Sequence, residues 1–302
     1  MSLPRALFAS LFDDAAVFPP GNSPLDTAVA EHRRLARGFH RDLIGPLLLP
    51  PAAIPAALDL AGLADLTDPQ DAETSPPPQD SGPLQIVIAA RPGTPREEVE
   101  YAAQLASADS RVEPRAVEIG WDEGWERIDL PAPTVVVEIP RGTEQALALT
   151  EIATAAAERP DTRYAAKFRT GATDTWAWPT EHELATSIQG AIAMEVPLKL
   201  TGGLHHAVRG SYPEAPGRNP QDMHGVLNVL AAFAAARAGR PVSAIQATLE
   251  QRDPGPLIAG LSALNPVSAA RLRGDFPSYG CCTVTDPITE LITLDVLEGP
   301  RS

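Results

Sequence analysis

The stretch RYAAKFRT, residues 163–170, is followed by a segment of helical length at 179–194 and then by VPLKLTG, residues 196–202. Both stretches have the length of a strand, are bounded by turn residues and are apolar on both faces, which is typical of a parallel sheet covered by helices. Further segments of helical length lie at 95–108 and 143–158. This alternation of strands and helices predicts an α/β protein.

Apolar runs of the same kind recur along the chain, so we expect eight strands. Eight is the number that closes a (β/α)8 barrel of the TIM type, which is the fold that we predict. An open, doubly wound sheet would also explain the alternation, but no G-x-G-x-x-G motif follows the first strand. Besides the two stretches quoted above, the expected strands lie at 11–18, 43–50, 84–90, 115–120, 134–140 and 278–284.

We expect a single domain over residues 1–302, with two interruptions of the regular alternation. Residues 67–83 are rich in Pro, Asp and Ser and are expected to form a disordered loop. Residues 207–277 separate the seventh and eighth strands and contain the helical runs HGVLNVLAAFAAARAG and VSAIQATLEQ. We expect this segment to be a helical elaboration that covers one end of the barrel.

Composition narrows the class of protein. The formal net charge is −15 and no basic cluster occurs, which argues against binding to nucleic acid or to an anionic membrane surface. The chain has no run of roughly 18 apolar residues, and its first residues lack the features of a signal peptide. Cys281 and Cys282 are adjacent and indicate no disulfide framework. We therefore expect a soluble, cytoplasmic protein with a small-molecule partner, and self-association into a homo-oligomer is compatible with these features.

Lysine usage is the most informative feature of the composition. Only two of the 24 basic residues are lysines, Lys167 and Lys199, and both lie inside predicted strands. Arginine cannot lose its proton or act as an amine nucleophile, whereas a desolvated lysine can do both. We expect the two side chains to lie side by side, so that repulsion lowers the pKa of one amine and allows it to attack a carbonyl group. The alternative is that each lysine forms a structural ion pair with a carboxylate such as Glu118 or Glu138.

The motif KFRTG at 167–171, followed about thirty residues later by KLTGG at 199–203, resembles the paired strands of class I deoxyribose-phosphate aldolases. The resemblance implies that Lys167 forms an imine with the substrate and that Lys199 tunes it. It also implies that the backbone N–H groups of Gly202 and Gly203 bind a phosphate or another anion. The last predicted strand, GCCTV, lacks the Gly-Ser turn with which that family binds phosphate.

A second resemblance spans most of the chain. The segments DDAAVFPP (13–20), KLTGGLHH (199–206), HGVLNVL (224–230) and YGCCTVTDPI (279–288), together with KFRTG, are similar to those of a bacterial family of uncharacterised proteins. This resemblance implies no activity.

Other polar residues lie where the strands of a barrel would end, which is the face that carries the active site. His205 and His206 directly follow the seventh strand and could act as a general base, a hydrogen-bond donor or a metal ligand. Glu118 and Glu138 lie in apolar strands and could relay protons and neutralise one lysine. Further candidates for substrate binding at strand ends and in the following loops are Asp13, Asp14, Trp121, Arg169, Thr170, Gly171, Trp176, Thr201 and His224.

Three functions remain open at this point. The first is an aldolase-like lyase that forms a Schiff base through Lys167 with a small hydroxylated or phosphorylated carbonyl compound, without a metal or a cofactor. The second is a sugar isomerase or hydrolase that depends on a divalent metal bound by carboxylates (Asp13 or Asp14, Glu118, Glu138) and a histidine. The third is a barrel-shaped binding protein without catalytic activity. The pair of lysines favours the first, because two cations beside a metal ion would repel it.

Overall fold

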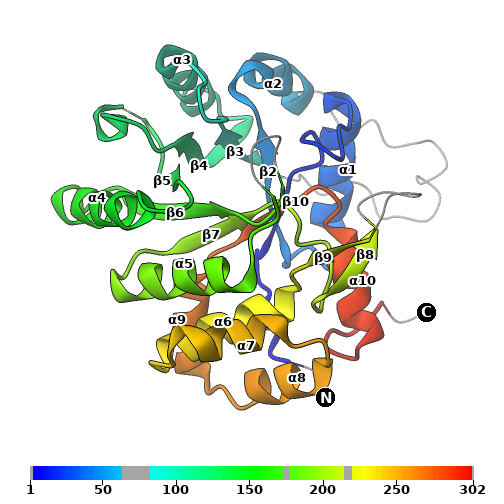
Figure 1. Cartoon of the computed structure of the whole chain (residues 1–302). Helices are drawn as coiled ribbons and strands as arrows, with labels where there is room; N and C mark the ends of the chain where they lie inside the picture. Colours follow the sequence, from blue (N-terminus) through cyan, green and yellow to red (C-terminus); the bar gives the residue numbers. More distant parts are fainter. Residues whose placement is uncertain (1–2, 63–81, 129, 173–176, 214–219, 301–302) are drawn as a thin grey trace.

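The structure is a computed structural model that describes residues 3–62, 82–128, 130–172, 177–213 and 220–300. Its centre is a closed barrel of eight parallel strands, which neighbour one another in the order β1-β10-β7-β6-β5-β4-β3-β2 (Figure 1). Their bounds are Phe12–Asp14 (β1), Ile44–Leu49 (β2), Leu84–Ala89 (β3), Val112–Gly120 (β4), Thr134–Glu138 (β5), Arg163–Arg169 (β6), Leu198–Thr201 (β7) and Tyr279–Cys281 (β10). The prediction of a (β/α)8 barrel is therefore confirmed.

Helices cover the outside of the barrel (Figure 1). They follow most of its strands, and their apolar faces and the outward side chains of the strands form one large core. A 3-10 turn, η3 (Trp125–Arg127), stands between β4 and β5 in place of a full helix. The covering helices are α1 (Leu25–Arg37), α2 (Ile54–Gly62), α3 (Arg96–Ser107), α4 (Gln145–Glu158), α5 (Glu181–Ala193) and α10 (Thr285–Thr293).

A second, smaller apolar cluster lies inside the barrel, and most of its members have short side chains. Alternate residues of a strand point to opposite faces, so each strand sends every second side chain inward. Because alanines occupy many of these positions, open space remains inside the barrel toward the carboxyl ends of its strands. The cluster comprises Ala15, Leu48, Val87, Ala89, Ala116, Val136 and Ala165.

The predicted helical insertion between the seventh and eighth barrel strands is present, and it also contains a β-hairpin that was not predicted. The hairpin pairs β8 (Gly210–Pro213) with β9 (Pro220–Met223) in antiparallel fashion. Its strands are short and mostly exposed, and they lack the apolar alternation that marks a strand in a sequence. Four helices follow: α6 (Val226–Arg237), α7 (Val242–Glu250), α8 (Pro254–Ser262) and α9 (Pro266–Asp275).

The disordered loop expected at 67–83 lies outside the described residues except for its last two positions. No helix in the described part of the chain combines the length and the apolar character that are needed to cross a membrane.

Helix α6 organises the insertion, because it contacts α5, α7, α8 and α9 and eight of its 12 residues are buried. One of these is polar. The Oδ1 atom of Asn228 accepts a hydrogen bond from the Arg209 N–H at 2.8 Å. The Nδ2 atom donates to the carbonyl groups of Thr248 at 3.0 Å and Gln251 at 2.6 Å, at the end of α7. The amide thus joins three segments that are distant in sequence.

We expect Asn228→Ala to lower the free energy of unfolding by about 1–3 kcal/mol, because it leaves buried backbone groups without partners. Urea denaturation measures this loss. The exposed α3 position Gln104→Ala is the control and should change stability by less than about 0.5 kcal/mol. Equal effects of the two substitutions would contradict the anchoring role of Asn228.

Candidate active site

Both lysines point into the barrel and share one carboxylate. Lys167 on β6 and Lys199 on β7 are register partners, so their side chains leave the same face of the sheet. The Nζ atom of Lys167 lies 2.8 Å from Oε2 of Glu118, and the Nζ atom of Lys199 lies 2.5 Å from Oε1 of the same residue. Each ammonium also has a second carboxylate partner. For Lys167 this is Glu138, at 2.9 Å, and for Lys199 it is Asp13.

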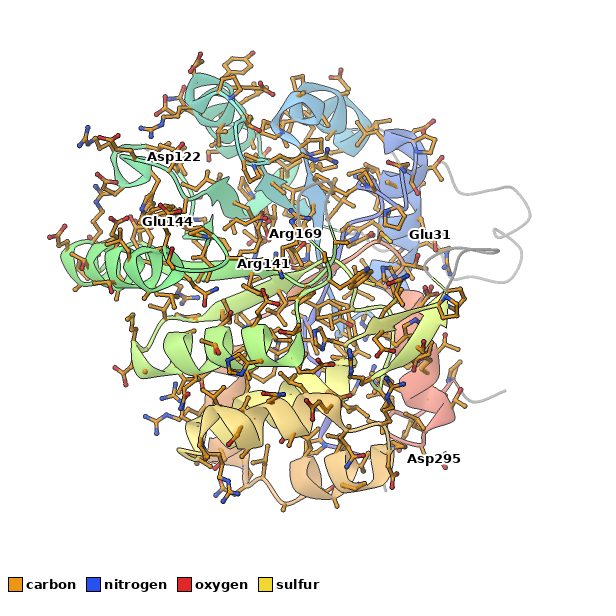
Figure 2. The ribbon with its side chains drawn as sticks, viewed as in Figure 1. Glu31, Asp122, Arg141, Glu144, Arg169 and Asp295 are labelled. Atoms are coloured by element: carbon orange, nitrogen blue, oxygen red, sulfur yellow. The ribbon has the colours of Figure 1, made fainter. Side chains whose placement is uncertain are left out.

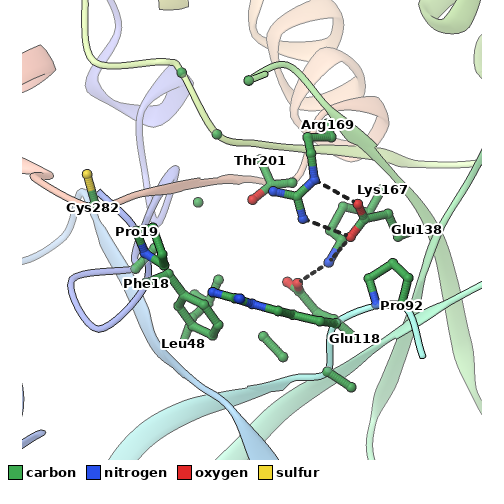
Figure 3. Close-up of a pocket in the computed structure, with 18 of the residues that line it drawn as sticks. Phe18, Pro19, Leu48, Pro92, Glu118, Glu138, Lys167, Arg169, Thr201 and Cys282 are labelled. Atoms are coloured by element: carbon green, nitrogen blue, oxygen red, sulfur yellow. Dashed lines mark hydrogen bonds and ion pairs between the residues drawn. The ribbon is translucent and has the colours of Figure 1, made fainter. Parts of the chain in front are cut away.

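The pairs continue into a chain of alternating charges that ends at Arg169. The guanidinium group of Arg169 donates hydrogen bonds to both carboxylate oxygens of Glu138, at 2.9 and 3.3 Å (Figure 3). We refer to these six side chains as the charge chain: Asp13, Lys199, Glu118, Lys167, Glu138 and Arg169. It contains three positive and three negative groups drawn from five strands.

Asp13 needs space that only a glycine provides. A Cβ atom on Gly45 of β2 would lie 2.1 Å from Oδ1 of Asp13, so no larger residue fits beside this carboxylate. Its other oxygen accepts a hydrogen bond from the Ser278 hydroxyl at 2.7 Å as well as from Lys199. Gly45, Ser278 and Lys199 therefore fix the position of the Asp13 carboxylate, which is the end of the charge chain opposite Arg169.

A cavity of about 720 Å³ opens above the charge chain, at the carboxyl ends of the barrel strands (Figure 3). Lys167, Glu118, Glu138 and Arg169 line it. Lys199 does not belong to the lining, and it lies below with Asp13. Only 3% of the surface of Lys167 is accessible, so the cavity is the route by which a ligand can reach its amine.

Attraction to the neighbouring carboxylates determines the charge state of the two lysines, because it outweighs both their burial and the repulsion between them. Burial opposes the charged form of Lys167, but Glu118 and Glu138 raise its pKa above the ordinary value. Burial likewise acts against Lys199, and Asp13 and Glu118 raise its pKa too. The expectation that repulsion lowers the pKa of one amine is therefore wrong for the resting site. Each lysine has two carboxylate neighbours, and the ion pairs considered as the alternative are present.

The balance between burial and neighbouring charges also determines the protonation state of Glu118, the carboxyl group that the two lysines share. Burial alone would raise the pKa of Glu118, but the two ammonium groups lower it from 4.5 to about 2. Glu138 has a lowered pKa for the same reason, with Lys167 and Arg169 overcoming its burial. Both carboxylates that face the cavity are thus ionised at neutral pH and can accept a proton only transiently.

The two adjacent histidines point to opposite sides of their loop. His205 lines the cavity, and its Nε2 atom lies 3.4 Å from Sγ of Cys282. Burial lowers the pKa of His205, so its imidazole is neutral at pH 7. His206 does not line the cavity. Its Nδ1 atom lies 2.7 Å from Oε1 of Glu290 on α10, and its ring stacks on Tyr212.

Asp14 and His224, two more of the predicted residues, also lie away from the cavity. Asp14 is next to Asp13 on a strand and so points outward, where its Oδ2 atom lies 3.0 Å from Nδ1 of His32. His224 is buried, with Nε2 lying 3.2 Å from the Pro179 carbonyl oxygen. Burial lowers the pKa of His224 to about 4. Both side chains pack the helical layer and do not reach the substrate space.

Small residues at the ends of β6 and β7 and in the loops that follow also line the cavity. They include Gly171, Thr201, Gly202 and Gly203. Thr170 does not line it, because its hydroxyl donates to the carbonyl groups of Thr201 and Gly202. The binding of an anion by the N–H groups of Gly202 and Gly203, which the resemblance implied, stays a prediction.

Aromatic side chains at the mouth of the barrel have supporting contacts. Trp121 lines the cavity, and its indole N–H donates to Oε2 of Glu151 on α4 at 2.8 Å. Trp178 covers Gly203, where a Cβ atom would lie 2.2 Å from its ring. Trp176, also predicted to bind substrate, lies outside the described residues.

Sequence reasoning missed two arginines that line the cavity, Arg91 and Arg141. In Figure 2, Arg141 and Arg169 lie over the centre of the barrel, whereas Asp295 lies at its periphery. Both missed residues directly follow predicted strands, so their position in the sequence could have identified them. Their residue type could not have identified them, because arginine is common in this chain, whereas rarity marked the two lysines.

No three His, Cys, Asp or Glu side chains of the described residues are arranged to hold a metal ion. The carboxylates of the proposed metal site are instead bound by ammonium and guanidinium groups. This arrangement does not favour the metal-dependent alternative.

We expect Lys199→Met to lower the free energy of unfolding by about 3–5 kcal/mol at neutral pH, because Asp13 and Glu118 lose a buried counter-charge. Without Lys199 the pKa of Glu118 rises, so the folded variant takes up a proton as the pH falls. The loss of stability should therefore be smaller at about pH 5 than at about pH 8, as measured by urea denaturation.

The control removes an exposed ion pair from the same protein. The Nη1 atom of Arg115 lies 2.6 Å from Oε1 of Glu113, and the two side chains are 52% and 41% exposed. Arg115→Met should cost about 0–1 kcal/mol at both pH values. A Lys199→Met deficit that does not change with pH would show that Glu118 does not depend on Lys199.

No protein-family model, curated protein or solved structure that we compared with this chain matches it.

Proposed function

We propose that this protein is a lyase of the class I aldolase type, which forms a Schiff base between Lys167 and a small carbonyl compound. One observation carries the proposal: a buried primary amine faces a cavity at the catalytic end of a (β/α)8 barrel, between two carboxylates. The barrel is consistent with an enzyme, and the amine supplies the reaction type.

The raised pKa of Lys167 requires a proton acceptor next to it, and Glu138 meets this need. Its Oε2 atom lies 2.9 Å from Nζ, within reach for a proton transfer. Glu138 takes a proton from the ammonium group as the amine attacks the carbonyl carbon. The carbonyl oxygen takes one further proton from the nitrogen that has added to the carbon, which gives a hydroxyl group. It then receives the proton held by Glu138 and leaves as water, so that of the three ammonium protons one stays on the nitrogen and two leave in the water.

The product of this step is an iminium ion with the same charge as the ammonium that it replaces. Glu118 and Glu138 therefore stabilise both states, and the water-excluding pocket strengthens their effect. The iminium group then accepts the electron pair of the carbon–carbon bond that breaks, giving a neutral enamine. His205 is the neutral base at the cavity wall that takes the proton of the substrate hydroxyl group in this step.

Lys199 has a separate role in the proposal. It does not line the cavity, and its ammonium group is held by Asp13 and Glu118. By sharing Glu118 it reduces the negative charge available to Lys167, which makes the loss of a proton from Lys167 easier than beside Glu118 and Glu138 alone. The imine forms on Lys167 and not on Lys199.

We expect borohydride reduction in the presence of a panel of small aldehydes and ketones to trap a covalent adduct on Lys167. Peptide mapping by mass spectrometry locates the adduct. Lys199 is the only other lysine of the sequence, so few primary amines compete with Lys167. Lys167→Arg keeps the positive charge and should abolish the adduct.

The matched control introduces an exposed lysine. Arg127 is 77% exposed, so Arg127→Lys reports the non-specific labelling of a solvated amine. Labelling of Lys167 should saturate with carbonyl concentration, whereas labelling at position 127 should not. The Schiff-base proposal fails if no carbonyl compound labels Lys167, or if both sites label alike.

A further inference from the structure

Arg91 stands at a rigid point on the rim of the cavity. The segment Arg91-Pro92-Gly93-Thr94 forms a turn in which the Thr94 N–H donates to the Arg91 carbonyl at 3.0 Å. Pro at the second position and Gly93 with φ of 86° are the residues that a type II turn requires. The turn packs against the end of β4, since a Cβ atom on Gly120 would lie 3.1 Å from Cα of Pro92.

The side chain of Arg91 has an aromatic support and no carboxylate partner among the described residues. Its guanidinium carbon lies 5.9 Å from the ring centre of Phe18, which also lines the cavity. The residue is exposed, so a ligand in the cavity can reach the five donors of its guanidinium group.

Among the described side chains, the charges of the cavity leave this one cation without a counter-charge. The groups that set this balance are the described charged side chains that line the cavity, the remaining members of the charge chain, and Glu183, the partner of Arg141. Four cations face four carboxylates: Lys167, Lys199, Arg141 and Arg169 against Asp13, Glu118, Glu138 and Glu183. Burial raises the pKa of Asp13, and we count it as ionised because Lys199 and Ser278 both bind its carboxylate and oppose that rise. Arg91 is the fifth cation.

We propose that the substrate of this site is an oxo acid, whose carboxylate is held by the guanidinium group of Arg91 while its carbonyl group faces Lys167. The carbonyl part of this inference rests on the proposed function. A carboxylate balances the single unmatched charge, whereas a phosphate monoester carries about −1.5 to −2 at neutral pH and leaves an excess. The planar guanidinium group also matches a carboxylate with two parallel hydrogen bonds.

The position of Arg91 distinguishes this site from the one that the resemblance to aldolases implied. Arg91 follows β3, and the glycine pair Gly202 and Gly203 follows β7. The two strands are four positions apart in either direction around the barrel, so they lie on opposite sides of its mouth. Because Lys167 is on β6, three strands from β3, the carbonyl and the carboxylate of the substrate are separated by several bonds.

The first test uses 4-oxopentanoate, its uncharged methyl ester and dihydroxyacetone phosphate as probes for borohydride trapping on Lys167. We expect 4-oxopentanoate to half-saturate labelling at a concentration about tenfold lower than its ester does, and Arg91→Gln to remove this difference. Arg115→Gln, which removes an equal charge from a distant exposed site, should preserve it. Preferential labelling by dihydroxyacetone phosphate, retained in Arg91→Gln, would overturn the carboxylate assignment and favour the glycine pair.

The second test does not require an imine. Pentanoate has the carboxylate but no carbonyl group, so the change in its binding between the unsubstituted chain and Arg91→Gln, measured by ligand-observed NMR titration, reports on the contact with Arg91 without an imine. We expect Arg91→Gln to weaken pentanoate binding about tenfold, Arg91→Lys to weaken it less, and Arg115→Gln to leave it unchanged. Unaltered binding of pentanoate in Arg91→Gln, or no binding to the unsubstituted chain, overturns the inference. If pentanoate binds as expected but no probe labels Lys167, the Schiff-base proposal fails and the anion site stands.

Discussion

The carboxylate of Glu118 is the interaction on which the candidate site depends. It lies between two buried ammonium groups, 2.8 Å from one and 2.5 Å from the other. Like charges this close in an interior of low dielectric constant repel strongly, and the carboxylate converts that repulsion into two attractions. Because its partners are on β6 and β7, and theirs on β1 and β5, one side chain couples five strands of the barrel through the register of their inner positions. The removal of any member leaves an uncompensated charge in the interior.

The sequence was a good guide to the barrel, because its strands are short, apolar on both faces and separated by segments of helical length. It was also informative about the lysines, whose rarity marked them in a chain that otherwise uses arginine. It was a poor guide to which of two adjacent polar residues faces inward. Asp13 joins the charge chain while Asp14 contacts α1, and His205 lines the cavity while His206 contacts α10. This choice depends on the phase of a strand or loop, which a dipeptide does not reveal.

The charge state of the lysines could not be predicted either, and for a related reason. A count of two neighbouring amines predicts a lowered pKa, but the sign of the shift depends on how many carboxylates share the pocket and at what distance. Glu118 and Glu138 had each been considered as partners of a single lysine. That Glu118 would serve both lysines follows from the curvature of the closed barrel, which brings the inner side chains of β4 and β7, three strands apart, within contact. Closure is a property of the whole chain and leaves no local pattern.

The ion pairs of this protein include an exposed and a buried population, which respond differently to ionic strength. The pair between Arg34 and Glu31 has side chains that are 61% and 47% exposed, so dissolved ions can approach and screen it. Lys167, Lys199 and Glu118 have at most 4% of their side chains exposed, so dissolved ions screen them much less. Salt therefore weakens the first population and leaves the second nearly unaffected. The electrostatic field that a reacting group meets at the bottom of the cavity is accordingly set mainly by the fold and only weakly by the electrolyte outside.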